Sequence, residues 1–172
     1  MYQLLKQIVT VGIKTERPPQ PDESLRVAGQ RLAEEVLRLF NGALTIRHVD
    51  AGSCNGCELE IHAANNVFHN LEGLSIKFVA SPRHADMLLV TGPVSRHMET
   101  ALRRTYDATP DPKLVVAVGD CGCDGGVFGE SYASCGRVSN VIPVDIAVPG
   151  CPPTPVAIIQ GILTAIRARR RG

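Results

Sequence analysis

The sequence predicts an α/β fold in which a mostly parallel sheet is covered by helices on both faces. Short apolar runs of strand length alternate along the chain with longer segments whose apolar residues recur at helical spacing. The runs over residues 87–91 and 114–118 are almost wholly apolar, as is typical of strands buried on both faces of a parallel sheet. With 172 residues, of which 44% are apolar, the chain can form one domain with a sizeable core.

The chain begins with a predicted amphipathic helix over residues 1–13, in which leucine, isoleucine and valine alternate with lysine and glutamine. Prolines at positions 18, 19 and 21 end this pattern, so an extended linker is expected there. We therefore predict an N-terminal arm with a Pro-rich linker over residues 1–23 and a single domain over residues 24–172. The apolar face of the arm suits packing on its own domain, on a partner subunit or on a membrane surface.

The domain is predicted to start with a helix over residues 24–40, because Ser24 is a candidate cap and Asn41-Gly42 a stop signal. The strands that follow are rich in leucine, isoleucine and valine and lie between turn residues. Strands are expected at residues 44–49, 74–80, 87–91, 114–118 and 141–144, and helices at residues 58–68, 95–106 and 156–167. The loops after parallel strands should meet at the carboxyl edge of the sheet, where ligands bind in such folds.

Four of the six cysteines follow predicted strands. Cys54 and Cys57 lie in the segment Cys-Asn-Gly-Cys, Cys121 follows strand 114–118, and Cys151 lies in Pro-Gly-Cys-Pro-Pro. Each iron of a cubane cluster binds one thiolate, so four cysteines from separate loops must converge on one point. Gly56 relieves crowding where the backbone approaches the cluster. The pattern predicts an iron–sulfur site for electron transfer.

Two other kinds of site use some of the same cysteines. A thioredoxin-like dithiol needs only Cys54 and Cys57 at a helix start, and it leaves Cys121 and Cys151 without a role. A four-cysteine zinc interaction module uses all four thiolates, but structural zinc sites usually contain two close-spaced pairs and this chain has one.

The remaining cysteines and the composition give broader expectations. Cys123 competes with Cys121 as a ligand, and spacing alone does not separate them, whereas Cys135 is expected to be an ordinary buried thiol. No secretory signal pattern is seen and no apolar run reaches the roughly 20 residues that span a bilayer. We therefore expect a cytoplasmic chain, in which clustered thiols favour metal or redox chemistry. A net charge of +1 gives no argument for nucleic acid binding.

Charged residues near the cysteines are candidates for a supporting role. The guanidinium of Arg83 would stabilise the extra negative charge of a reduced cluster and raise its potential, although a plain surface arginine is the commoner case. Glu58 and Glu60 follow Cys57 directly, where they could relay protons or favour the start of a helix electrostatically.

The region from Val49 to Pro155 resembles one known family: the small subunits of membrane-bound, energy-converting (group 4) nickel–iron hydrogenases together with the B-type (20 kDa) subunit of respiratory complex I. The segments that carry the resemblance are Cys54-Asn55-Gly56-Cys57-Glu58, Ser81-Pro82-Arg83-His84-Ala85-Asp86, Val90-Thr91-Gly92-Pro93-Val94, Pro110-Asp111-Pro112-Lys113, Gly125-Gly126-Val127-Phe128 and the run from Ile142 to Pro155. The resemblance implies a flavodoxin-like domain that binds one [4Fe-4S] cluster. It implies Cys54, Cys57, Cys121 and Cys151 as the ligands and Cys123 as an extra thiol.

The resemblance also implies a function. Complex I members have adjacent cysteines at the first ligand position, whereas Asn55 and Gly56 separate Cys54 from Cys57 here, which favours the hydrogenase branch. We expect an electron-transfer subunit of an oxidoreductase, whose cluster is proximal to the active site of a membrane-associated nickel–iron hydrogenase of the formate hydrogenlyase or ferredoxin- or CO-linked type. The expected partners are the large nickel–iron subunit, a ferredoxin-like iron–sulfur subunit and membrane subunits, at the cytoplasmic face of the cell membrane. A complex I-like quinone oxidoreductase or a nickel-free hydrogenase-related complex is the alternative.

Overall fold

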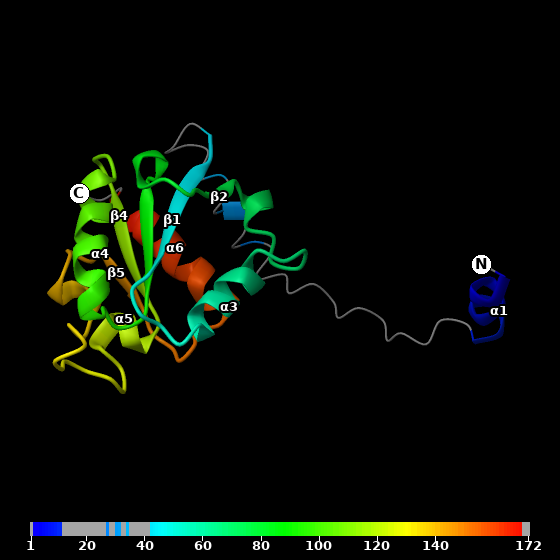
Figure 1. The fold of residues 1–172 in the computed structure, drawn as a ribbon. Coiled ribbons are helices and arrows are strands. Elements are labelled where there is room, and N and C mark those ends of the chain that lie inside the picture. Colours follow the sequence, from blue (N-terminus) through cyan, green and yellow to red (C-terminus); the bar gives the residue numbers. More distant parts are fainter. Residues whose placement is uncertain (1, 12–26, 28–29, 32–33, 35–41, 170–172) are drawn as a thin grey trace.

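A parallel sheet forms the centre of the computed structural model. The residues that the structure describes are 2–11, 27, 30–31, 34 and 42–169. The strands are β1 (Leu44–Asp50), β2 (Ile76–Phe78), β3 (Met87–Thr91), β4 (Leu114–Val118) and β5 (Ile146–Val148). Within the described residues these five strands are all parallel and lie in the order β2-β1-β3-β4-β5. This is the flavodoxin-like strand order, in which the direction of winding changes between β1 and β3 (Figure 1).

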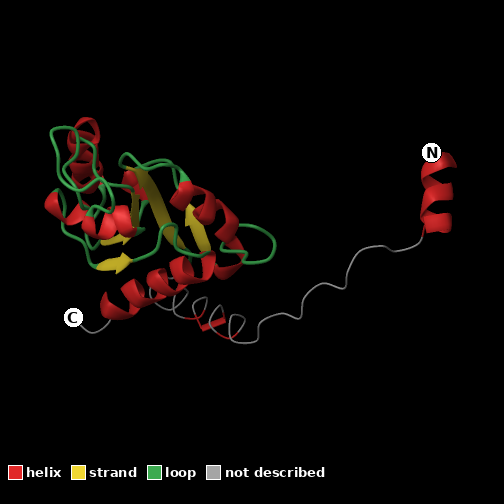
Figure 2. Cartoon of the chain, turned by 90° about the horizontal axis from the view of Figure 1, so that it is seen from below, coloured by secondary structure: helices red, strands yellow, loops and turns green. Residues whose placement is uncertain are grey.

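Helices cover both faces of the sheet, as predicted (Figure 2). The α-helices are α1 (Tyr2–Val11), α3 (Gly56–Ala64), α4 (Arg96–Ala108), α5 (Asp120–Asp124) and α6 (Pro155–Arg169), and the 3₁₀ helices are η1 (Glu72–Leu74), η2 (Pro82–His84) and η3 (Val138–Asn140). Helices α3 and α6 pack together on one face of the sheet, and α4 lies on the other. The α/β class expected from the alternating apolar pattern is therefore confirmed.

The core has two layers, one on each face. On the first face Ile162 of α6 and Ile61 of α3 pack with Leu89 of β3. On the second face Leu102 of α4 packs with Val90, the next residue of the same strand. Strands β3 and β4 are buried at every position, which explains their continuous apolar sequence.

Helix α3 is shorter than predicted. It ends at Ala64, whereas the apolar pattern predicted a helix to residue 68. The Asn66 side chain explains the difference, because its Oδ1 accepts the backbone N–H groups of Phe68 and His69 at 2.8 and 3.0 Å. This local turn replaces the acceptors that a continuing helix would supply.

The last strand also differs from the prediction, which placed it at residues 141–144. Strand β5 instead covers Ile146–Val148, while Val141 and Ile142 pack into the core beneath α4. The N–H groups of Val141 and Ile142 donate to the Val138 carbonyl at 2.9 and 3.1 Å, at the end of η3, and Pro143 has no N–H. This apolar segment therefore has no free donors with which to join the sheet. Asp145 then starts the pairing, because its carboxylate accepts the Val115 N–H at 2.7 Å and its own N–H donates to the Val115 carbonyl.

The N-terminal predictions are tested only in part. Helix α1 forms within the predicted arm, and Figure 1 shows it apart from the sheet. The linker and most of the helix predicted over residues 24–40 lie outside the described residues. In the described part of the chain, no helix is both long and apolar enough to cross a membrane.

The packing of α6 supports a stability prediction. Ile162 is fully buried between α6 and the sheet, so Ile162→Ala leaves a cavity and should lower the free energy of unfolding by about 2–5 kcal/mol. The matched control is Gln160→Ala on the exposed side of the same helix, expected to change it by less than about 0.5 kcal/mol. Chemical denaturation followed by circular dichroism measures both, and equal effects would contradict the packing.

Candidate functional site

The structure brings the four predicted cysteines to the carboxyl edge of the sheet. Cys54 and Cys57 follow β1 at the start of α3, Cys121 lies in α5 after β4, and Cys151 lies between β5 and α6. Cys54 and Cys151 are exposed, and Cys57 and Cys121 are partly buried. Three separate loops thus present thiols at one edge, where parallel α/β sheets hold their ligands.

The loop that carries Cys54 is fixed by its own polar groups. Asp50, the last residue of β1, accepts the backbone N–H groups of Gly52 and Ser53 at 2.9 and 2.8 Å. Asn55 then adopts a left-handed conformation with φ 73° as the N-cap of α3. The chain therefore turns sharply between Cys54 and the helix that carries Cys57.

Hydrogen bonds join the loops of Cys121 and Cys151. The Asp120 carboxylate accepts the Gly150 N–H at 2.6 Å, and the Asp120 N–H donates to the Gly150 carbonyl at 2.9 Å. The N–H of Gly119 also donates to the Val148 carbonyl, which continues the pairing of β4 with β5 beyond the strand ends. The two cysteines each follow one member of the Asp120–Gly150 pair, so their separation is held by this contact.

Glycines leave room for the sulfur atoms. A side-chain carbon on Gly119 would lie 2.5 Å from the Cys57 sulfur, and one on Gly126 would lie 2.8 Å from the Cys121 sulfur. Both distances are shorter than real carbon–sulfur contacts, and both glycines have positive φ. These sulfurs lie directly against the backbone of the loop that follows β4.

The four thiols lie within electrostatic reach of one another. Burial, then the Glu58 carboxylate, then the thiols of Cys121, Cys54 and Cys151 raise the pKa of Cys57 to about 12. The pKa of Cys121 is also raised, by burial first and then by Cys151 and Cys54. Protonated thiols must lose their protons to bind a metal, so the binding of a metal centre by these cysteines releases protons.

A cavity of about 490 Å³ opens beside two of the cysteines. It is lined by Asp120, Cys121, Asp124, Gly126, Val127 and Cys151. Asp120 and Asp124 also raise the pKa of Cys121, after the larger effects of burial and the neighbouring thiols. Sequence reasoning missed these two acids, although each lies next to a cysteine or glycine in the segment Gly-Asp-Cys-Gly-Cys-Asp-Gly.

The other two cysteines have different surroundings. The Cys123 thiol points to the Ala117 carbonyl at 3.8 Å, and burial raises its pKa to about 11. Cys135 is buried, as predicted, and its sulfur lies 3.3 Å from the Glu99 carboxylate. Neither residue lines the cavity that Cys121 and Cys151 share.

The predicted tuning role of Arg83 required a position beside the cysteines, and Arg83 is not among the charges found to act on Cys57 or Cys121. It belongs to η2, which precedes β3, and the following Asp86 donates its N–H to Thr45 at the start of β1. Arg83 therefore lies towards the amino edge of the sheet, opposite the four thiols.

The donor set suits an iron–sulfur cluster. Among the described residues, no three histidine, cysteine, aspartate or glutamate side chains lie close enough to share one metal ion. In a cubane cluster each thiolate binds its own iron, which is a wider arrangement than the shell of a single ion. Four thiols on three loops, with glycine backbone beside two of the sulfurs, fit that arrangement.

Relatives of this chain are named as subunits of hydrogenase and formate hydrogenlyase enzymes. A membrane-bound hydrogenase subunit of Pyrococcus furiosus is 49% identical over 119 residues, which are 69% of this chain and 71% of the relative. Formate hydrogenlyase subunit 7 of Escherichia coli is 40% identical over 149 residues, which are 87% of this chain but only 57% of the relative.

A solved structure and a family profile complete the comparison. A chain in the structure of the membrane-bound sulfane sulfur reductase, an archaeal respiratory membrane complex, superposes with a TM-score of 0.67 at 29% identity, covering 84% of this chain and 77% of that one. The profile of the family described as NADH ubiquinone oxidoreductase, 20 kDa subunit, matches residues 54–165, from the first candidate ligand into α6. The resemblance seen in the sequence is thus confirmed, and the chain belongs to this family of oxidoreductase subunits.

Proposed function

We propose that this chain is the electron-transfer subunit of a multisubunit, membrane-associated nickel–iron hydrogenase and carries one [4Fe-4S] cluster proximal to the active site. The hydrogenase would be of the formate hydrogenlyase type or linked to ferredoxin or CO. The observation that carries the proposal is the convergence of four thiols from three loops at one edge of the sheet. Membership of the family and the names of its hydrogenase relatives support it.

In this proposal Cys54, Cys57, Cys121 and Cys151 hold the cluster. When bound, a [4Fe-4S] cluster passes single electrons between a donor and an acceptor. The protein's part is to hold the four sulfurs at fixed positions, so that little rearrangement accompanies a change of charge. The bonds between Asp120 and Gly150 serve that purpose.

Neighbouring charges would set how readily the site accepts an electron. The carboxylates of Asp120 and Asp124 line the cavity beside Cys121 and Cys151. Negative charge close to the thiolates disfavours further negative charge there, so these acids lower the reduction potential. Backbone N–H groups of the glycine-rich loop act in the opposite sense when they point at sulfur.

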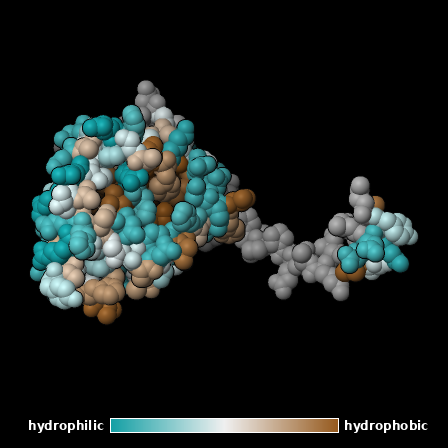
Figure 3. Space-filling view, viewed as in Figure 1, coloured by the Kyte–Doolittle hydropathy of each residue, from teal (hydrophilic) through white to brown (hydrophobic). Residues whose placement is uncertain are grey.

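Exposed apolar side chains near the cysteines support the presence of partner subunits. Leu59 follows the Cys57 segment, and Val127 and Phe128 follow Gly126, with 59%, 96% and 62% of their surfaces exposed. Figure 3 shows a hydrophobic tip at the lowest part of the domain, where Figure 1 draws the loop after α5. Such a patch beside a cofactor site is typical of a protein contact.

The partners proposed for this surface are the large nickel–iron subunit and a ferredoxin-like iron–sulfur subunit. The membrane subunits of the complex would place this chain as a peripheral subunit at the cytoplasmic face of the cell membrane. The names of the relatives support membrane association of the whole complex.

A second candidate function keeps the cluster and changes the reaction. The family name and the sulfane sulfur reductase structure support a quinone oxidoreductase like complex I or a nickel-free complex related to hydrogenases. Asn55 and Gly56, which separate the first two cysteines, favour the hydrogenase. A zinc module or a thiol oxidoreductase would contain no acid-labile sulfide.

The deciding experiment uses the whole complex, purified without oxygen. Electron paramagnetic resonance under hydrogen should show a reduced [4Fe-4S] signal that depends on this subunit, together with nickel in the large subunit. Reduction by NADH or a quinol but not by hydrogen would instead support the second candidate. Zinc without iron or sulfide would contradict both.

The choice of ligands can be tested by two serine substitutions. Cys151→Ser should remove the [4Fe-4S] signal and the hydrogen-linked electron transfer, because one iron loses its thiolate. Cys123→Ser is the matched control: its thiol points to the Ala117 carbonyl, so iron and sulfide contents should match the wild type. Loss of the cluster in Cys123→Ser and its retention in Cys151→Ser would contradict the ligand assignment.

The role of Gly119 can be tested by adding one methyl group. Gly119→Ala would place a carbon 2.5 Å from the Cys57 sulfur and should lower iron binding about 10–100-fold. Gly129→Ala is the control, because Gly129 also has positive φ but nothing lies within 4 Å of an added carbon. Iron content and visible absorbance measure the difference, and similar losses in both variants would assign the effect to backbone strain alone.

A further inference from the structure

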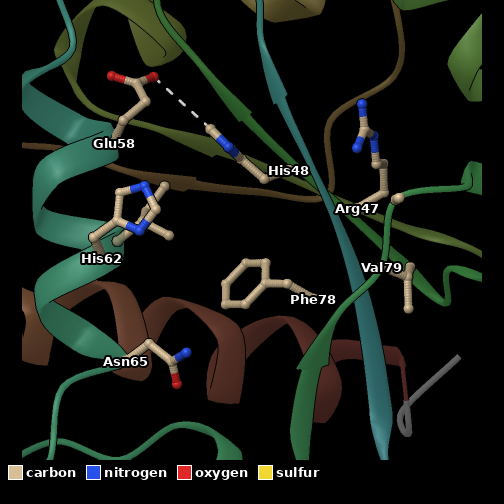
Figure 4. Close-up of a pocket in the computed structure, with 9 residues that line it drawn as sticks. Arg47, His48, Glu58, His62, Asn65, Phe78 and Val79 are labelled. Carbon is tan, nitrogen blue, oxygen red and sulfur yellow. Dashed lines mark ion pairs between the residues drawn. The ribbon is translucent and has the colours of Figure 1, made fainter.

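A second cavity, of about 380 Å³, lies between α3, β1 and the segment that follows β2 (Figure 4). It is lined by Arg47, His48, Glu58, Ile61, His62, Asn65, Phe78, Val79 and Ala80. None of the four candidate cluster ligands lines it. The electron-transfer role leaves this cavity without a use.

The Glu58 carboxylate is buried in this cavity without a hydrogen-bond partner among the described residues. Its side chain is only 8% exposed, and among the described residues neither carboxylate oxygen has a hydrogen bond. Figure 4 shows the side chain directed from α3 towards β1. A buried carboxylate is strongly destabilising unless donors or a counter-charge reach it.

His48 does not supply that counter-charge. Its Nε2 lies 3.8 Å from Glu58 Oε1, which is too long for a hydrogen bond, and the same nitrogen lies 3.1 Å from the Thr91 hydroxyl. Burial lowers the pKa of His48, although the charges of Glu58 and Asp50 act to raise it. The imidazole is therefore mainly neutral at pH 7.

Arg47 also belongs to the lining of the cavity, from strand β1. Figure 4 shows it across strand β1 from Glu58, with its guanidinium directed away from the carboxylate. Its Nε is buried and has no hydrogen-bond partner within the described residues. The open group inside the cavity is therefore the Glu58 carboxylate, while the Arg47 guanidinium lies beyond β1.

The surface around α3 is typical of a protein contact. Leu59 is 59% exposed on the same helix, and Val67 and Phe68 are 100% and 60% exposed in the turn that follows it. A free small cation would satisfy Glu58 but leave these apolar residues exposed. A polypeptide can supply a cationic side chain to Glu58 and also cover the apolar residues.

We propose that this cavity receives a basic side chain of a neighbouring subunit, whose cationic group binds the Glu58 carboxylate. Arginine fits best, because its two parallel N–H donors match the two open carboxylate oxygens. The proposal rests on the proposed function only in requiring that the chain belongs to a multisubunit complex.

The test compares the binding of wild-type, Glu58→Gln and Glu60→Gln subunits to the rest of the complex, purified without this subunit. Glu58→Gln should bind at least about tenfold more weakly, because the partner's buried cation loses its counter-charge. Glu60→Gln should bind within about twofold of the wild type, since Glu60 lies on the same helix but does not line the cavity. A structure of the assembled complex should show an arginine or lysine nitrogen in contact with Glu58.

Two measurements distinguish a loss of the contact with the partner from misfolding of the variant or loss of its cluster. The thermal midpoint of the isolated Glu58→Gln subunit should be no lower than that of the wild type, because the variant removes an unpaired buried charge. Its iron and sulfide contents report on the cluster independently of docking. Equal binding of Glu58→Gln and wild type would overturn the proposal, as would an assembled complex whose cavity holds water, a small molecule or residues of this chain.

Discussion

The reciprocal hydrogen bonds between Asp120 and Gly150 are the contact on which the geometry of the candidate site depends. They continue the pairing of β4 with β5 past the ends of both strands, to the residues just before Cys121 and Cys151. Loops at a sheet edge otherwise have no fixed separation. Because a carboxylate accepts the Gly150 N–H at 2.6 Å, two loops that are 30 residues apart in the sequence behave as one unit.

The segment that carries Cys54 and Cys57 is held instead by the hydrophobic core. Ile61 and Ala64 of α3 are buried in the cluster of side chains that also holds α6 and the sheet. Cys57 lies in the first turn of α3, so its sulfur is held by a helix packed along its length and by the Gly119 backbone. The hydrophobic core and the polar edge of the sheet therefore determine the site together.

Much of this could be predicted from the sequence, for identifiable physical reasons. Buried parallel strands such as β3 and β4 are continuously apolar, and strand ends gather at one edge, so the convergence of the cysteines followed from their positions. The predictions failed where local hydrogen bonds redirect the backbone: the Asn66 side chain ends α3, and the bonds to the Val138 carbonyl, followed by Pro143, delay β5. The loop bonds of Asp120 could not be predicted, because they join residues without any periodic pattern. The cavity at Glu58 depends on the packing of α3 against β1, which the spacing of residues does not reveal.

Three consecutive residues of α3 face three different environments. Successive side chains on a helix point about 100° apart, so Cys57 faces the other thiols, Glu58 faces the cavity beside β1, and Leu59 faces solvent. The nine residues of α3 form one hydrogen-bonded helix, which is stiff over this length. Rotation or sliding of this helix would shift the Cys57 sulfur, the Glu58 carboxylate and the Leu59 side chain together. The thiol site, the cavity and the exposed surface are therefore mechanically coupled through one short helix.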